Sequence, residues 1–170
     1  MKLKKIISGA QTGADIGGIR AAKDAGLETG GWIPAGFKTQ DGSKPEYAEL
    51  YGIREHSSDR YSPRTYSNAR DSEATVRFAS NWNSPGERCT LKAISQYNKP
   101  YMDVDVGDFS RGGDFSKVEE VRKFISRFAV VNIAGNAERT CNNMEKFVYK
   151  FMSEVLKECT TEQSRQNSLA

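Results

Sequence analysis

The chain has 170 residues, most simply one domain whose core buries about 70% of the surface of the unfolded chain. Its formal charge of +3 is small, and no apolar run approaches the roughly 18 residues of a membrane span, so we expect neither nucleic acid nor a membrane as partner. The three cysteines form no CxxC pair, which argues against a disulfide framework and a zinc site and for a cytoplasmic protein with free thiols. The single histidine argues against a histidine-based metal site and a Ser-His-Asp relay.

The first predicted unit is a strand that turns directly into a helix. Residues 4–8, with the apolar pair Ile6 and Ile7, predict a short buried strand, and helical spacing predicts a helix over 14–25 with Gly26 as its stop. Such a turn directs the free N–H groups of the helix to one point, which favours an anion. The motif is neither GxGxxG nor a P-loop, so the alternative is a tight turn with Thr12 as a helix cap. The polar and glycine residues of the turn are Gly9, Gln11, Thr12, Gly13 and Asp15.

The next segments continue the alternation of strands and helices. A strand is predicted at 28–33, and the polar loop 35–43 either folds over the first turn and brings Lys38 near it or stays solvated. Further elements are a short helix at 46–51, an edge strand at 52–55 and a helix at 63–73.

A second strand-turn-helix unit covers a strand at 75–80, a turn at 81–86 and a helix at 87–97. We expect the two units on neighbouring strands, so that their turns face each other at the carboxyl end of the sheet, where α/β folds bind ligands. The remaining elements are a strand at 100–105, a helix at 115–128, a strand at 129–135 with a turn at 135–139, and a helix at 143–159.

This order of elements predicts an α/β fold, a three-layer Rossmann-like sandwich with a central, mainly parallel sheet of about five to seven strands. Residues 1–159 form a single nucleotide-binding domain. Residues 160–170 are polar and lack periodicity, so we expect a disordered tail.

Four ordered blocks, SGAQTGAD at 8–15, GGWIP at 30–34, RTYSNARDS at 64–72 and NIAG at 132–135, resemble the molybdenum cofactor carrier family. That family is a branch of the Rossmann-like superfamily that includes lysine-decarboxylase-like and DprA-like proteins. The resemblance covers about residues 4–150. It implies a nucleotide-binding cleft, often in a homo-oligomer, for ligands that include derivatives of NAD.

The resemblance also implies a set of ligand-binding residues. The first turn supplies Gly9, Gln11, Thr12, Gly13 and Asp15, the helix block Arg64, Asn68 and Asp71, and the last turn Asn132, Gly135 and Arg139. Lys38, Ser80, Gly86 and Thr90 complete the predicted set.

One departure concerns the second turn, where Glu87 and Cys89 replace the small residues expected of the family. The phosphoribohydrolase relatives carry PGGxGTxxE, and alignment through Gly86 and Thr90 places Ala93 at their catalytic glutamate. We therefore expect no hydrolysis of this type and assign no catalytic residue.

The leading hypothesis is a protein that binds a phosphate-bearing nucleotide for sensing, carriage or sequestration without turnover, with an ADP-ribose-like molecule or another derivative of NAD as the ligand. It requires no further cofactor. One alternative is a carrier of the molybdenum cofactor, and another is a nucleotide hydrolase with Asp15 or Asp71 as base. Because Asp15 lies beside a helix N-terminus, we expect a low pKa for its carboxyl group and a poor proton acceptor.

Overall fold

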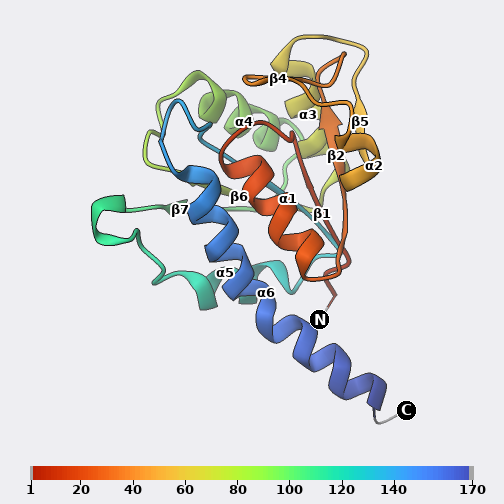
Figure 1. The fold of residues 1–170 in the computed structure, drawn as a ribbon, viewed down its shortest axis with the longest axis vertical. Coiled ribbons are helices and arrows are strands. Elements are labelled where there is room, and N and C mark those ends of the chain that lie inside the picture. The colour runs from red at the N-terminus through yellow and green to blue at the C-terminus, as the bar shows by residue number, and fades with distance from the viewer. Residues whose placement is uncertain (1, 169–170) are drawn as a thin grey trace.

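The computed structural model describes residues 2–168, in which six strands form one parallel sheet between two layers of helices (Figure 1). The strand order is β5-β2-β1-β8-β6-β7, and each neighbouring pair runs parallel. This arrangement confirms the predicted three-layer Rossmann-like sandwich. The strands are β1 (Lys5–Ser8), β2 (Glu28–Ile33), β5 (Ile53–Glu55), β6 (Ala74–Ala79), β7 (Tyr101–Asp105) and β8 (Val130–Gly135).

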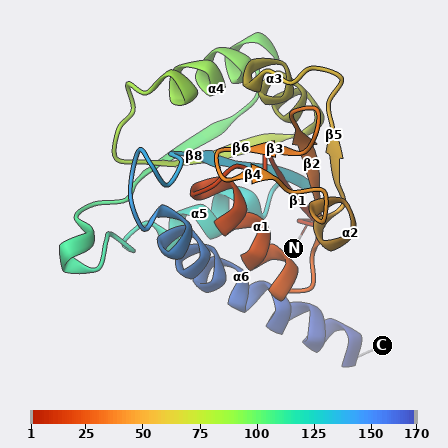
Figure 2. The same ribbon diagram turned by 45° about the horizontal axis from the view of Figure 1, so that its top comes forward.

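Helices cover both faces of the sheet. Figure 2 shows α3 and α4 on one side and α1, α5 and α6 on the other, and the contacts of α3 with α4 and of α6 with both α1 and α5 agree with this division. The helices are α1 (Ala14–Asp24), α2 (Tyr47–Tyr51), α3 (Tyr61–Asp71), α4 (Pro85–Gln96), α5 (Val118–Ile125) and α6 (Met144–Ser168), with a short 3₁₀ turn η1 (Phe109–Arg111).

The core lies on both faces of the sheet, between the strands and the helices. Since helices cover both faces, the strands present apolar side chains on both. All six residues of β6 are buried, as expected for a central strand of this kind. On the α1 side, Phe78 of β6 meets Phe151 of α6 edge to face, with ring centroids 5.2 Å apart. The apolar stripe predicted for the last helix thus packs on the sheet.

Two elements differ from the sequence-based expectation in extent. The helix predicted over 115–128 is shorter, Val118–Ile125. The last helix does not end at 159 but continues to Ser168, so the structure places helix in most of the segment for which we predicted disorder; residues 169–170 lie outside the described part. The sequence from 157 to 168 contains neither Gly nor Pro, so no local stop signal ends the helix.

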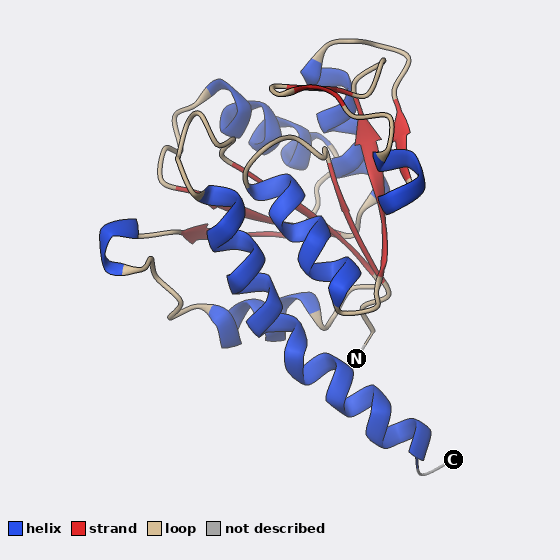
Figure 3. Ribbon diagram, in the orientation of Figure 1, coloured by secondary structure: helices blue, strands red, loops and turns tan. Residues whose placement is uncertain are grey.

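The expectation that the two strand-turn-helix units are neighbours is wrong. Strand β8 lies between β1 and β6 and pairs with both. The crossover through α5 returns the chain to the centre of the sheet, and local periodicity does not specify such a return. The hairpin of β3 (Lys38–Thr39) and β4 (Gly42–Ser43) within the loop after β2 was also not predicted (Figure 3).

Among residues 2–168, no helix combines the length and the apolar composition that crossing a membrane requires.

Candidate ligand-binding site

Three turns at the carboxyl end of the sheet surround a cavity of about 400 Å³. They follow β1, β6 and β8, and α3 supplies a further wall. In open α/β sheets ligands bind at this end, near the point where the strand order reverses. The sequence-predicted residues that line the cavity are Gln11, Asp15, Arg64, Gly86, Thr90, Gly135 and Arg139.

The turn after β1 is closed by the turn after β8. Gly13 has a φ of 87°, and a Cβ atom there would overlap the carbonyl oxygen of Asn136 and lie 2.9 Å from Cα of Ala137. The amide of Ala14 donates to the same carbonyl oxygen, at 3.1 Å, and the amide of Ile16 donates to the carbonyl oxygen of Gln11. These two helix N–H groups are therefore engaged within the chain, contrary to the expectation that the start of α1 points free donors at an anion.

The start of α4 is the more open helix terminus. The Ser84 side chain caps it by accepting a hydrogen bond from the amide of Glu87, and Pro85 occupies the first turn. A Cβ atom at Gly86 would have no described atom within 4 Å. Because Ser84, Pro85 and Gly86 all line the cavity, the positive end of the α4 dipole and an accessible backbone lie at its wall.

Arg64 lies over the first turn. A Cβ atom at Gly9 would overlap the end of the Arg64 side chain, so glycine permits the close approach of this guanidinium group to the backbone. The guanidinium nitrogen Nη1 lies 3.6 Å from Oδ2 of Asp15, and only 14% of the Arg64 side chain is exposed. Gly9 thus contributes to the site by leaving room for a cation.

Two carboxyl groups in the cavity have raised pKa values. Burial raises the pKa of Asp15 to about 6, although the charge of Arg64 and the backbone amides of Gln11 and Gly9 oppose the change. Burial also raises the pKa of Glu87 to about 7, where the nearby Asp15 charge adds to the rise and the hydrogen bond from Asn136 opposes it. The expected low pKa of Asp15 is therefore wrong, because loss of hydration outweighs the helix terminus.

A network of polar contacts fixes Glu87 in the wall. Its Oε2 atom accepts hydrogen bonds from Nδ2 of Asn136 at 2.9 Å and from the Ser84 hydroxyl at 3.3 Å. Asn136 in turn accepts from the backbone amides of Ser80 and Asn81, both at 3.0 Å. The network joins the turns after β6 and β8, and it explains the place of Ser80, whose backbone and not its side chain takes part.

The loop after β2 folds back over the first turn. This is one of the two predicted alternatives for residues 35–43, the other being a solvated loop. Nε2 of Gln11 donates to the carbonyl oxygen of Lys38 at 3.0 Å, and the Thr12 hydroxyl donates to Oε1 of Gln40 at 2.6 Å. The Lys38 ammonium group itself lies near the carbonyl oxygen of Asp59 and 5.3 Å from the Tyr61 ring centroid. Thr12 and Lys38 thus hold the loop in place and do not line the cavity.

The remaining predicted residues lie elsewhere. Asn68 clamps the backbone of Trp32, with Nδ2 donating to its carbonyl oxygen and Oδ1 accepting from its amide, at 3.0 and 2.9 Å. Asp71 accepts from the Trp32 indole, and a hydrogen bond from Arg70 lowers the pKa of its carboxyl group. Asn132 is buried in β8 and donates to the Thr75 hydroxyl. Asp71 is therefore not placed to act on a ligand in the cavity.

Glu87 was not among the predicted site residues. A signal was present, because Ser84 followed three residues later by glutamate is the capping-box pattern of a helix start. That pattern predicts the position of the side chain at the helix terminus but not its burial, which depends on Asn136 from a distant turn.

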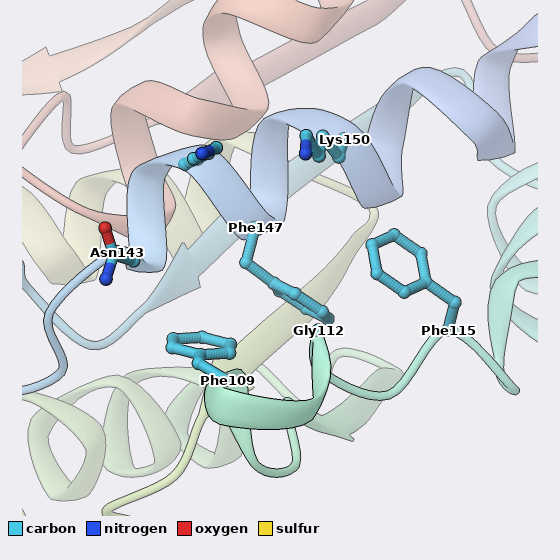
Figure 4. A pocket seen from close by; sticks show the side chains of 7 residues that line it. Phe109, Gly112, Phe115, Asn143, Phe147 and Lys150 are labelled. Atoms are coloured by element: carbon cyan, nitrogen blue, oxygen red, sulfur yellow. The ribbon is translucent and has the colours of Figure 1, made fainter.

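A second cavity, of about 370 Å³, lies between η1 and α6. Figure 4 shows Phe147 of α6 between Phe109 and Phe115, with Lys146 and Lys150 also in the lining. Its charged groups are exposed. No group of three or more His, Cys, Asp or Glu residues in the described chain is placed to hold a metal ion.

Comparisons with known proteins agree with this architecture. A family model for the circularly permutated YpsA SLOG family matches residues 6–156. Among solved structures, the chain is similar to a "Putative molybdenum carrier protein" from Syntrophus aciditrophicus SB, with a TM-score of 0.76 and 28% identity over 92% of this chain and 96% of that chain. No curated protein matches the chain.

The solved neighbour confirms the resemblance to molybdenum cofactor carriers found in the sequence. The family model includes all three turns around the cavity. On this match, the protein belongs to the circularly permutated YpsA SLOG family.

Proposed function

We propose that this protein binds and carries a phosphate-bearing heterocyclic ligand without turning it over, with the molybdenum cofactor as the first candidate and an ADP-ribose-like nucleotide as the second. The observation that carries the proposal is the composition of the cavity wall. Arg64, Arg139 and the start of α4 favour a phosphate group. Asp15 and Glu87 are buried in the same wall and supply acceptors for the N–H groups of a heterocycle.

The molybdenum cofactor comes first because the similar solved structure is described as a molybdenum carrier. The cofactor is a pterin that carries both a phosphate and the metal. Its phosphate matches the cationic part of the wall, and the N–H groups of its pterin match the acceptors Asp15 and Glu87. A nucleotide comes second because it also combines a phosphate with a heterocycle, and the sequence motifs resemble a nucleotide-binding superfamily. In either case the ligand is cargo and not a resident prosthetic group.

One observation favours hydrolysis as a competing function. The pKa values of Asp15 and Glu87, about 6 and about 7, are close to those of general acids and bases that work near neutral pH. Against it, the position aligned with the catalytic glutamate of the hydrolytic relatives is Ala93, a buried residue of α4. A binding role therefore accounts for more of the site.

The test is to identify what the protein holds after purification. The protein would be expressed in cells that make the molybdenum cofactor, then denatured, and the released compounds analysed by mass spectrometry together with the molybdenum content. We expect an intact pterin phosphate with molybdenum, or an intact nucleotide if the second candidate is correct. Recovery of a free base and ribose phosphate after incubation with a nucleotide, lost in Asp15→Asn, would instead establish the hydrolase.

A further inference from the structure

We propose that Glu87 selects the ligand by its hydrogen-bond donors, so that the cavity takes heterocycles with the 2-amino-4-oxopyrimidine edge shared by pterin and guanine and discriminates against adenine. This inference rests on the proposed function, because it concerns the heterocycle of the same phosphate-bearing ligand. The inference assigns a role to Glu87, which stands where the resembled family has a small residue. It also assigns a class of heterocycle that the comparisons do not give.

Unpartnered buried atoms concentrate at this cavity. Four buried side-chain atoms of the described residues have no hydrogen-bond partner, and three of them belong to residues that line it. These are Oε1 of Glu87, Oε1 of Gln11 and Nε of Arg64. Since a buried polar atom without a partner is destabilising, a bound ligand that supplies the partners would be favoured.

The carboxyl group of Glu87 is fixed before any ligand arrives. Its residue is 2% exposed, and Oε2 is held by Asn136 and Ser84. The side-chain amide of Asn136 is itself fixed by backbone groups. Its Oδ1 atom accepts from the amides of Ser80 and Asn81, and its Nδ2 atom also donates to the carbonyl oxygen of Asn81. A carboxyl group held by one oxygen, with the other unpartnered, is preorganised to accept hydrogen bonds in one direction.

The chemistry of the unpartnered atoms determines what they recognise. When Glu87 is ionised, its Oε1 atom and Oε1 of Gln11 are both acceptors, so the matching part of a ligand must present N–H groups. The pyrimidine edge of pterin and guanine offers a ring N–H beside an exocyclic amino group, two donors that match in kind and number the two unpartnered oxygens of Glu87 and Gln11. Adenine presents an unprotonated ring nitrogen beside its amino group, which would leave Glu87 facing an acceptor.

The experiment compares GMP, IMP and AMP by calorimetry at pH 7.5, since the three share the ribose phosphate and differ only on the base edge. GMP offers both donors, IMP lacks the amino group, and AMP lacks the ring N–H. We expect wild-type protein to bind GMP at least about tenfold more tightly than AMP, with IMP between them, as for loss of a hydrogen bond to a charged group.

Glu87→Gln provides the decisive variant. Its amide oxygen can still accept from Asn136, so the wall is retained, but an NH₂ group replaces the unpartnered oxygen. The variant should therefore lose the preference for GMP while still binding the ribose phosphate. Glu120→Gln removes the same charge from an exposed residue of α5 and should keep the preference; circular dichroism checks that both variants fold.

The outcomes separate this inference from the function on which it rests. If wild-type protein binds the three nucleotides equally, or if Glu87→Gln keeps the GMP preference, Glu87 does not read the base and only this inference is refuted. If none of the three binds at millimolar concentration, this inference fails. The binding of a phosphate-bearing heterocycle fails with it only if the purified protein also releases neither a pterin phosphate nor a nucleotide.

Discussion

The burial of Asp15 predicts a specific dependence of stability on pH. A carboxyl group whose pKa is higher in the folded than in the unfolded state holds its proton more tightly when folded. Its contribution to the free energy of unfolding therefore falls as pH rises from the unfolded to the folded pKa. For Asp15 this window runs from 3.8 to about 6. Ionised Asp15 thus destabilises the free protein at neutral pH, as expected of a group retained for function.

The magnitude follows from the same two values. A rise from 3.8 to about 6 corresponds to about 3 kcal/mol at roughly 1.36 kcal/mol per pKa unit. About 2 kcal/mol of this is lost between pH ~4 and pH ~7. Asp15→Asn removes the titration but keeps an oxygen that can accept the amide hydrogen bond from Gln11, which the carboxylate accepts at 3.3 Å.

The assay is urea denaturation of wild-type protein and Asp15→Asn across this pH range. The wild type should lose about 2 kcal/mol more than the variant as pH rises. Asp71→Asn is the control of opposite sign, because a hydrogen bond from Arg70 lowers the pKa of Asp71, so this carboxyl group stabilises the fold at neutral pH and the benefit is lost on acidification. Parallel stability curves for the wild type and Asp15→Asn would refute the reasoning.

Two further predictions concern the turns. Gly13→Ala should lower the free energy of unfolding by about 2 kcal/mol or more relative to the control variant Gly26→Ala. Both glycines have positive φ, but only at Gly13 would a Cβ atom overlap Asn136. Equal urea midpoints for the two variants would contradict this. Arg139→Ala should weaken GMP binding more than Lys38→Ala in calorimetry, because Arg139 lines the cavity whereas the Lys38 ammonium group lies near the carbonyl oxygen of Asp59, outside the cavity lining. The reverse order would make the loop after β2 the main ligand contact.

Much of the fold could be predicted because it depends on local patterns. Strand β2 begins and ends at the predicted residues, Glu28 and Ile33, since Pro34 ends it and glycine precedes its start. The layer architecture follows from the alternation of strands and helices alone. The end of α6 could not be predicted in this way, because it lacks a Gly or Pro stop.

The candidate site was predicted in part. Gln11, Asp15 and Arg64 line the cavity as expected, because residues at the ends of parallel strands and on the adjoining helix gather at one edge of the sheet. Asn68 and Asp71 share the motif of Arg64 but face Trp32. A helix block places residues on several faces, and only the packing of α3 decides which face meets the cavity.

The sequence by itself determined the class of fold, the three turns and the chemical groups available to a ligand, because these depend on residues close together in the chain. The tertiary structure decided the rest. Insertion of β8 between β1 and β6 brought Asn136 against both Gly13 and Glu87, which closed the first turn and fixed the carboxyl group in the second. The pKa values of Asp15 and Glu87 depend on how much water distant segments exclude from them, and no local pattern records that exclusion.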